Sequence, residues 1–143
     1  MKTVNDVLQI KGRDVWTIEA GAKVFEALTL MAEKGIGALA VMDGDKIAGI
    51  ISERDYARKV ILKGKSSKDC PVSDIMTREV LYVKSWQTME DCMALMTEKH
   101  IRHLPVMEGD RLAGLISIGD VVKAIISDKQ SVIDQMQSYI LGR

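Results

Sequence analysis

At 143 residues the chain is long enough for one compact domain, and because each half alone would be marginally stable, two units of about 65 residues should share one core. Its 20 basic and 20 acidic residues cancel, which argues against a nucleic-acid binder and gives no reason to expect a membrane partner. There is no N-terminal signal pattern, no apolar run near the roughly 20 residues that span a bilayer, and too few cysteines for a disulfide scaffold, so a cytoplasmic protein with Cys70 and Cys92 reduced is predicted.

The first half predicts a β-α-β-β-α unit over residues 5–62. A short strand at 15–18 is followed by a helix with apolar residues at helical spacing, and then by strands at 39–42 and 46–51. A tight turn around Gly44 joins these two strands, and a second helix should begin near Glu53. The apolar face of the first helix is predicted to pack in the core, and it consists of Val24, Ala27, Leu28 and Met31.

The second half repeats the first at a constant offset of 65 residues, without a gap. Between residues 31–55 and 96–120, 14 of 25 positions are identical, where composition alone would give roughly one or two. The repeat at 72–127 therefore predicts a strand at 80–83, a helix capped by Thr88 and Asp91, strands at 104–107 and 111–116, and a helix from Ile118. The fold class is α+β.

Two segments lie outside the repeats. Residues 63–71 are polar, rich in Gly, Ser and Lys, and end in proline, which indicates a linker. Residues 128–143 predict an amphipathic helix, with one face formed by Val132, Ile133, Met136, Tyr139 and Ile140. Two interpretations of this helix stay open: it packs on its own domain, or it is buried in a dimer.

A serine followed three residues later by an aspartate occurs in both repeats, where the last strand meets the second helix. The pairs are Ser52 with Asp55 and Ser117 with Asp120. A serine at a helix N-terminus can help to bind an anion, and the aspartate can accept hydrogen bonds from a vicinal diol such as a ribose. The alternative is a capping box that stabilises the helix by about 0.5–2 kcal/mol. The appearance of the Ser-x-x-Asp pair twice, in matched positions of the two repeats, favours the binding role.

The pattern Gly-hydrophobic-hydrophobic-Ser-x-x-Asp occurs at 49–55 and at 114–120, after a Leu-Pro-Val-like strand. In two copies it resembles a pair of cystathionine-β-synthase (CBS) domains, or Bateman module, over about residues 5–127. Residues 52–59 are similar to small stand-alone bacterial CBS-pair proteins. The resemblance implies two repeats packed with pseudo-two-fold symmetry around a shared cleft, which binds an adenine nucleotide (AMP, ADP, ATP or NAD). It also implies a homodimer.

The resemblance implies one site at Ser52 and Asp55 and another at Ser117 and Asp120, with Gly119 in the same turn. The aspartates would hold ribose hydroxyls, and the serines a phosphate or the ribose. The repeats differ at the entrance to their first hairpin strand, where the small Gly37 and Ala38 would leave room for adenine and the basic Arg102 and His103 would reach phosphates. Two unequal sites are expected. Further basic residues could contact phosphate, the alternative for each being solvated surface: Lys11, Arg54, Arg58 and Lys59.

No catalytic or metal site is predicted. The glycines at 35–40 match a dinucleotide fingerprint, but here a helix precedes them and a strand follows, the reverse of what that motif requires. His100 and His103 lack further zinc ligands, and Cys70 lacks a placed base. The leading hypothesis is a non-catalytic sensor that binds adenine nucleotides and signals to an unidentified protein target. The alternative is a structural dimerisation adaptor with vestigial pockets.

Overall fold

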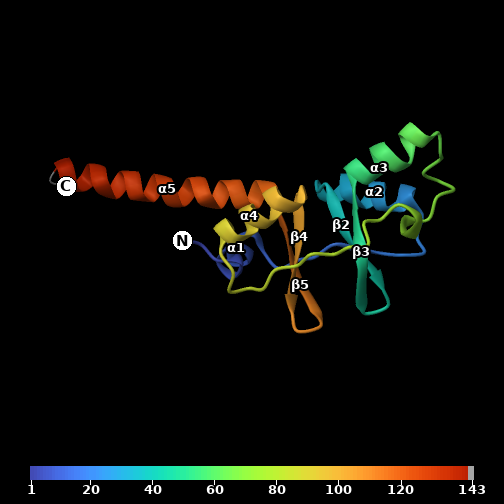
Figure 1. The fold of residues 1–143 in the computed structure, drawn as a ribbon, viewed down its shortest axis with the longest axis horizontal. Helices are drawn as coiled ribbons and strands as arrows, with labels where there is room; N and C mark the ends of the chain where they lie inside the picture. Colours follow the sequence, from blue (N-terminus) through green and yellow to red (C-terminus); the bar gives the residue numbers. More distant parts are fainter. Residues whose placement is uncertain (142–143) are drawn as a thin grey trace. The chain divides into compact units, whose positions relative to one another are not determined.

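The computed structural model describes residues 1–141 (Figure 1). The described residues form helices together with two small sheets, one of three strands and one of two, which confirms the predicted α+β class. In chain order the elements are α1 (Val4–Lys11), β1 (Thr17–Glu19), α2 (Val24–Lys34), β2 (Ala38–Asp43), β3 (Lys46–Ser52), α3 (Glu53–Lys59), the 3₁₀ turns η1 (Ile61–Lys63) and η2 (Val72–Asp74), α4 (Met89–Lys99), β4 (His103–Glu108), β5 (Arg111–Ser117) and α5 (Ile118–Leu141).

The chain forms two compact units that cut across the sequence repeats. The first-repeat unit comprises Asp14–Leu81 with Gly109–Leu112, and the second-repeat unit comprises Met1–Arg13, Tyr82–Glu108 and the chain from Ala113 onward. The opening segment of each repeat thus belongs to the unit built mainly from the other repeat. Each unit has its own hydrophobic cluster, so the prediction of one shared core is wrong. The exchanged segments explain this, because each completes the core it joins.

In the second-repeat unit, α1 supplies the exchanged segment. Its side chains Val4, Val7 and Leu8 are buried with residues of α4, β4, β5 and α5. Leu8 packs directly over Gly114, where an added Cβ would lie only 2.7 Å from Leu8 Cδ2. This helix is not predicted by the sequence pattern, because its eight residues are too few for a distinct apolar period.

In the first-repeat unit, the exchanged segment contains η2 and buries Val72, Ile75 and Met76. The unit holds a three-stranded sheet in which β2 is central, pairing in parallel with β1 and antiparallel with β3. All but the end of β2 is buried, which suits its continuous apolar sequence. The four predicted hairpin strands are confirmed as β2, β3, β4 and β5, and both second helices begin at the predicted residues.

The predicted strand at 80–83 is wrong. Only Val83 forms an isolated parallel bridge, to Val106, whereas the equivalent strand of the first repeat is β1. Val83 N–H donates to Pro105 O at 3.0 Å, and Met107 N–H donates to Val83 O at 3.0 Å. The first repeat has Ala40 at the position of Pro105. Because proline has no N–H to donate to the chain that precedes Val83, the ladder cannot extend toward residue 80.

The C-terminal segment is not a separate helix. It continues α5 without a break to Leu141, and Figure 1 shows α5 running on beyond α1 and α4; residues 142–143 of the predicted segment lie outside the described part. The five stripe residues named above are 47–89% exposed, which contradicts packing on their own domain. No helix within residues 1–141 is long and apolar enough to cross a membrane.

Both cysteines are free thiols and both are buried. Burial is the largest of the effects that raise the pKa of Cys92 to about 11, with the charges of Asp91 and Glu90 adding to it. The Cys92 thiol therefore stays protonated and unreactive at neutral pH.

Candidate functional site

The Ser-Asp motif of the first-repeat unit joins the end of β3 to the first turn of α3. Ser52 Oγ accepts a hydrogen bond from Asp55 N–H at 3.2 Å, and Ser52 N–H donates to Asp55 Oδ2 at 3.0 Å. These two bonds are a complete capping box, so the structural alternative weighed for this motif is confirmed. The cap holds the Asp55 carboxylate in a fixed place at the start of the helix.

Gly37 and Ala38 lie beside this cap. Ala38 is opposite Ser52 in the β2–β3 ladder, and Gly37 O accepts a hydrogen bond from Glu53 N–H at 3.0 Å. A Cβ added to Gly37 would meet nothing closer than Glu53 Oε1 at 3.9 Å. The two small residues predicted to leave room for a base therefore adjoin the Ser-Asp pair, although Ala38 is itself buried.

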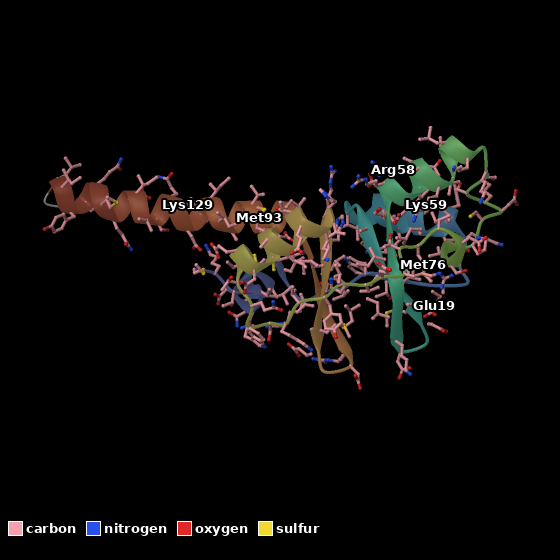
Figure 2. All side chains as sticks on the ribbon, viewed as in Figure 1. Glu19, Arg58, Lys59, Met76, Met93 and Lys129 are labelled. Carbon is pink, nitrogen blue, oxygen red and sulfur yellow. The ribbon has the colours of Figure 1, made fainter. Side chains whose placement is uncertain are left out.

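Basic residues of α3 occupy different surroundings. Arg54, Arg58 and Lys59 are all exposed, but only Lys59 contacts the cap; Figure 2 labels Arg58 and Lys59 on this helix. Lys59 Nζ lies 3.1 Å from Asp55 Oδ1 and donates to Ile75 O at 2.9 Å. Thr77 Oγ1 also donates to Asp55 Oδ1, at 3.4 Å. Lys59, predicted to contact phosphate, thus binds the site's own carboxylate, and the role of Thr77 was not foreseen.

The second-repeat unit contains the equivalent cap. Ser117 N–H donates to Asp120 Oδ2 at 2.9 Å, and Asp120 N–H donates to Ser117 Oγ at 3.2 Å. Arg102 O accepts from Ile118 N–H at 2.8 Å, which places the backbone of this basic residue against the cap. His103 follows as the first residue of β4, and Gly119 is exposed within the turn.

Lys11, the last residue of α1, contacts the Asp120 carboxylate. Its Nζ lies 2.6 Å from Asp120 Oδ2 and 2.7 Å from Leu115 O. Burial raises the pKa of Asp120, but the ammonium of Lys11 and the N–H of Ser117 outweigh burial and hold this pKa below its ordinary value. Asp120 is therefore an anion at neutral pH. Lys11 was predicted to contact phosphate, and the structure places it at the carboxylate.

A cavity of about 350 Å³ opens next to Asp120 in the second-repeat unit. Its lining comes from α1, α5 and the residues before α1: Lys2, Val7, Ile10, Lys11, Asp120, Lys123, Ala124 and Ser127. The volume lies at the lower end of the range of small-molecule pockets. Sequence reasoning missed the contribution of Lys2, Lys123 and Ser127, because only the docking of α1 against α5 brings them together.

Comparison with known proteins gives a consistent family. The CBS domain model matches residues 4–62 and 72–127. The chain is 37% identical over 150 residues to the CBS domain-containing protein CBSX3, mitochondrial, of Arabidopsis thaliana, covering 98% of this chain and 72% of that protein. A solved structure of a protein with CBS domains from Burkholderia ambifaria MC40-6 is 55% identical, with a TM-score of 0.85, and the match covers 89% of this chain and 96% of that one.

A more distant solved structure shares the fold. It is the CBS domain pair of protein MJ0100, in complex with 5′-methylthioadenosine and S-adenosyl-L-methionine. The TM-score is 0.79 at 22% identity, and the match covers 90% of this chain and 98% of that chain.

Proposed function

The chain belongs to the CBS domain family, of which it carries two copies, and from this premise we propose that it is a non-catalytic regulatory module that binds an adenine nucleotide. The observation that carries the proposal is the ionised Asp120 carboxylate, fixed by a cap beside an open cavity. The adenosine ligands in the MJ0100 pair support the choice of ligand class.

The chemistry of recognition follows from the groups near each cap. A carboxylate accepts hydrogen bonds from ribose hydroxyls, and basic side chains such as Arg102 and His103 attract the phosphates of AMP, ADP, ATP or NAD. Binding is non-covalent. The output is a shift between conformations that have different affinities for the nucleotide. The buried, free thiols are consistent with the proposed cytoplasmic location.

A thermal-shift titration tests the proposal. Nucleotide at a hundred times its Kd should stabilise the folded chain by about 2.7 kcal/mol, a rise in Tm of several degrees. AMP, ATP and NAD are compared with GMP, which has the ribose and phosphate of AMP but another base. The proposal fails if none of the three adenine nucleotides raises the Tm at millimolar concentration, or if GMP raises it as much as AMP.

A second candidate function, a homodimerising adaptor, is favoured by the exposed stripe on α5. The large side chains of this stripe are exposed, and within residues 118–141 the only charged residue that follows Lys129, which Figure 2 labels, is Asp134. Fully burying one such side chain contributes about 1.5–3 kcal/mol, so pairing with a second copy, or with a protein target, would stabilise a complex.

Sedimentation of the full chain tests the adaptor function. Met136→Glu with Ile140→Glu should convert a dimer to a monomer, whereas Gln135→Glu with Gln137→Glu, an equal change of charge at exposed polar positions of the same helix, should not. A double variant that sediments as the wild type removes the stripe as a dimer contact. Nucleotide binding in the monomeric variant would separate the two functions.

A further inference from the structure

We propose that the exposed stripe on α5 binds the same stripe of a second copy of this chain, with the two helices antiparallel, and that Lys129 sets this orientation. The inference rests on the homodimerising adaptor function proposed above and names the partner and the geometry of the contact. The stripe begins after residue 127, where the match to the CBS domain family ends, so the contact lies outside the two repeats.

The apolar residues on this face of α5 follow a seven-residue repeat. Alternating steps of four and three residues connect the members of this heptad series: Val122, Ile126, Lys129, Ile133, Met136 and Ile140. The five apolar members are 40–75% exposed, which leaves much of each side chain uncovered in the single chain. A repeat of seven is the spacing at which one α-helix packs along another in a coiled coil. The pattern therefore predicts a helical partner for this face.

The helix is held to the start of the chain where the stripe begins. Lys2 N–H donates to Asp128 Oδ2 at 3.0 Å, and Lys2 Nζ lies 3.0 Å from Asp128 Oδ1. Lys129, labelled in Figure 2, is the next residue of α5. A helix that is already formed and anchored loses little conformational freedom when it binds, which favours association.

Lys129 is the one charged member of the heptad series, and it disfavours a parallel pair. In a parallel pair in register, each residue of the series would face its own copy, so the two Lys129 ammonium groups would meet in one layer and repel each other. A lysine at a single position of such a series is one of the features that specify how coiled-coil helices pair. The parallel arrangement is therefore the less stable one.

The antiparallel arrangement gives Lys129 a favourable neighbour. When Ile133 faces Met136 of the second copy, the residues four positions further out also meet, and Lys129 then faces Ile140 of that copy. Ile140 lies in the last described turn of α5, which contains no basic residue and whose carbonyl groups give this helix end a partial negative charge. The aliphatic part of Lys129 can pack on Ile140 while its ammonium lies near that end. The face is thus complementary to itself when reversed.

Cross-linking of mixed cysteine variants of the full chain tests the orientation. Gln130→Cys and Gln137→Cys change exposed polar residues and leave the heptad series intact. In the antiparallel pair, residue 130 lies beside residue 137 of the second copy, whereas residue 130 and its own copy lie about 10 Å apart along the helix axis. A short bifunctional thiol reagent should therefore join the two variants when they are mixed and should join neither variant to itself. The wild type should not be joined, since Cys70 and Cys92 are buried.

Sedimentation equilibrium of a charge-reversed variant tests the role of Lys129. Lys129→Glu should weaken self-association about tenfold or more, since each of the two contacts with a helix end contributes roughly two- to fivefold and the reversal turns attraction into repulsion. Lys65→Glu makes the same change of charge at an exposed lysine outside α5 and should leave the Kd within about twofold.

The outcomes separate the inference from the proposed functions. A wild-type chain that sediments as a monomer up to the highest concentration used overturns the adaptor function and the inference together. A dimer in which each variant is joined to itself, or in which the mixed variants are not joined, overturns the inference and leaves dimerisation intact. A Lys129→Glu chain that associates as tightly as the wild type also overturns it. Nucleotide binding, measured by thermal shift, stands or falls independently of all three results.

Discussion

Gly49→Ala should destabilise the first-repeat unit severely, although alanine suits the backbone at this position. Gly49 lies in β3 where the segment after η2 passes over the strand. An added Cβ would lie 2.7 Å from Thr77 O and 2.9 Å from Met76 Sδ. A real Cβ does not approach a backbone oxygen this closely, so the strand or the segment must shift.

The size of the effect follows from what must move. Thr77 is paired with Ile50 by two backbone hydrogen bonds, of 3.0 Å from Ile50 N–H and 2.8 Å from Thr77 N–H. Overpacking costs about 1–3 kcal/mol, and weakening one buried hydrogen bond adds about 0.5–1.5 kcal/mol. We expect a loss of about 2–4 kcal/mol and a Tm lower by about 5–15 °C.

Urea unfolding followed by circular dichroism measures this loss against two matched glycines. Gly114→Ala, at the equivalent position, meets only the side chain of Leu8 and should cost less than Gly49→Ala. Gly119→Ala meets Ser117 Oγ at an ordinary 3.6 Å and should be neutral or stabilising by up to about 1 kcal/mol, since alanine favours the helix. A Gly49→Ala protein within about 0.5 kcal/mol of the wild type would refute the reasoning.

Three further changes test other parts of the structure. Leu8→Ala should cost about 2–5 kcal/mol in urea unfolding because Leu8 is 1% exposed, whereas Ile10→Ala, at 77% exposure on the same helix, should cost almost nothing. His100→Gly should raise the Tm by a few degrees, since His100 caps α4 at a φ of 56°, a left-handed conformation that costs about 1 kcal/mol without glycine. Lys11→Met should lower the free energy of unfolding at pH 7 but not in strong acid. Burial raises the pKa of Asp120, but Lys11 and Ser117 hold this pKa below its ordinary value of 3.8. The stabilisation is therefore present above about pH 4 and is lost as the pH falls through the pKa of Asp120 in the folded chain.

Local patterns predicted most of the elements. The hairpin strands and the start of α3 followed from apolar runs, a glycine turn and a Ser-Asp cap, all of which act between near neighbours in sequence. The predictions failed where residues distant in the sequence determine the local structure. Residues 80–83 resemble a strand, yet the missing N–H of Pro105 ends the ladder at Val83. Helix α1 had no clear period and forms against a core drawn from residues after 81.

For the candidate sites, too, the sequence predicted the local motifs and not their partners from distant parts of the chain. Both Ser-Asp pairs, and the small or basic residues beside them, were visible in the sequence because a motif and its copy could be compared position by position. The partners of the carboxylates were not. Lys11 lies 109 residues from Asp120, and Thr77 lies 22 residues from Asp55.

The sequence by itself determined that the chain is a duplication and where its hairpins and caps lie. These are short-range properties, set by backbone geometry and side-chain spacing. Only the tertiary structure decided that each unit takes its opening segment from the other repeat, and that the two aspartates meet different donors. A carboxylate accepts hydrogen bonds from whichever donors the fold brings to it. The two identical Ser-Asp motifs therefore acquire different hydrogen-bond partners once the surrounding chain has folded.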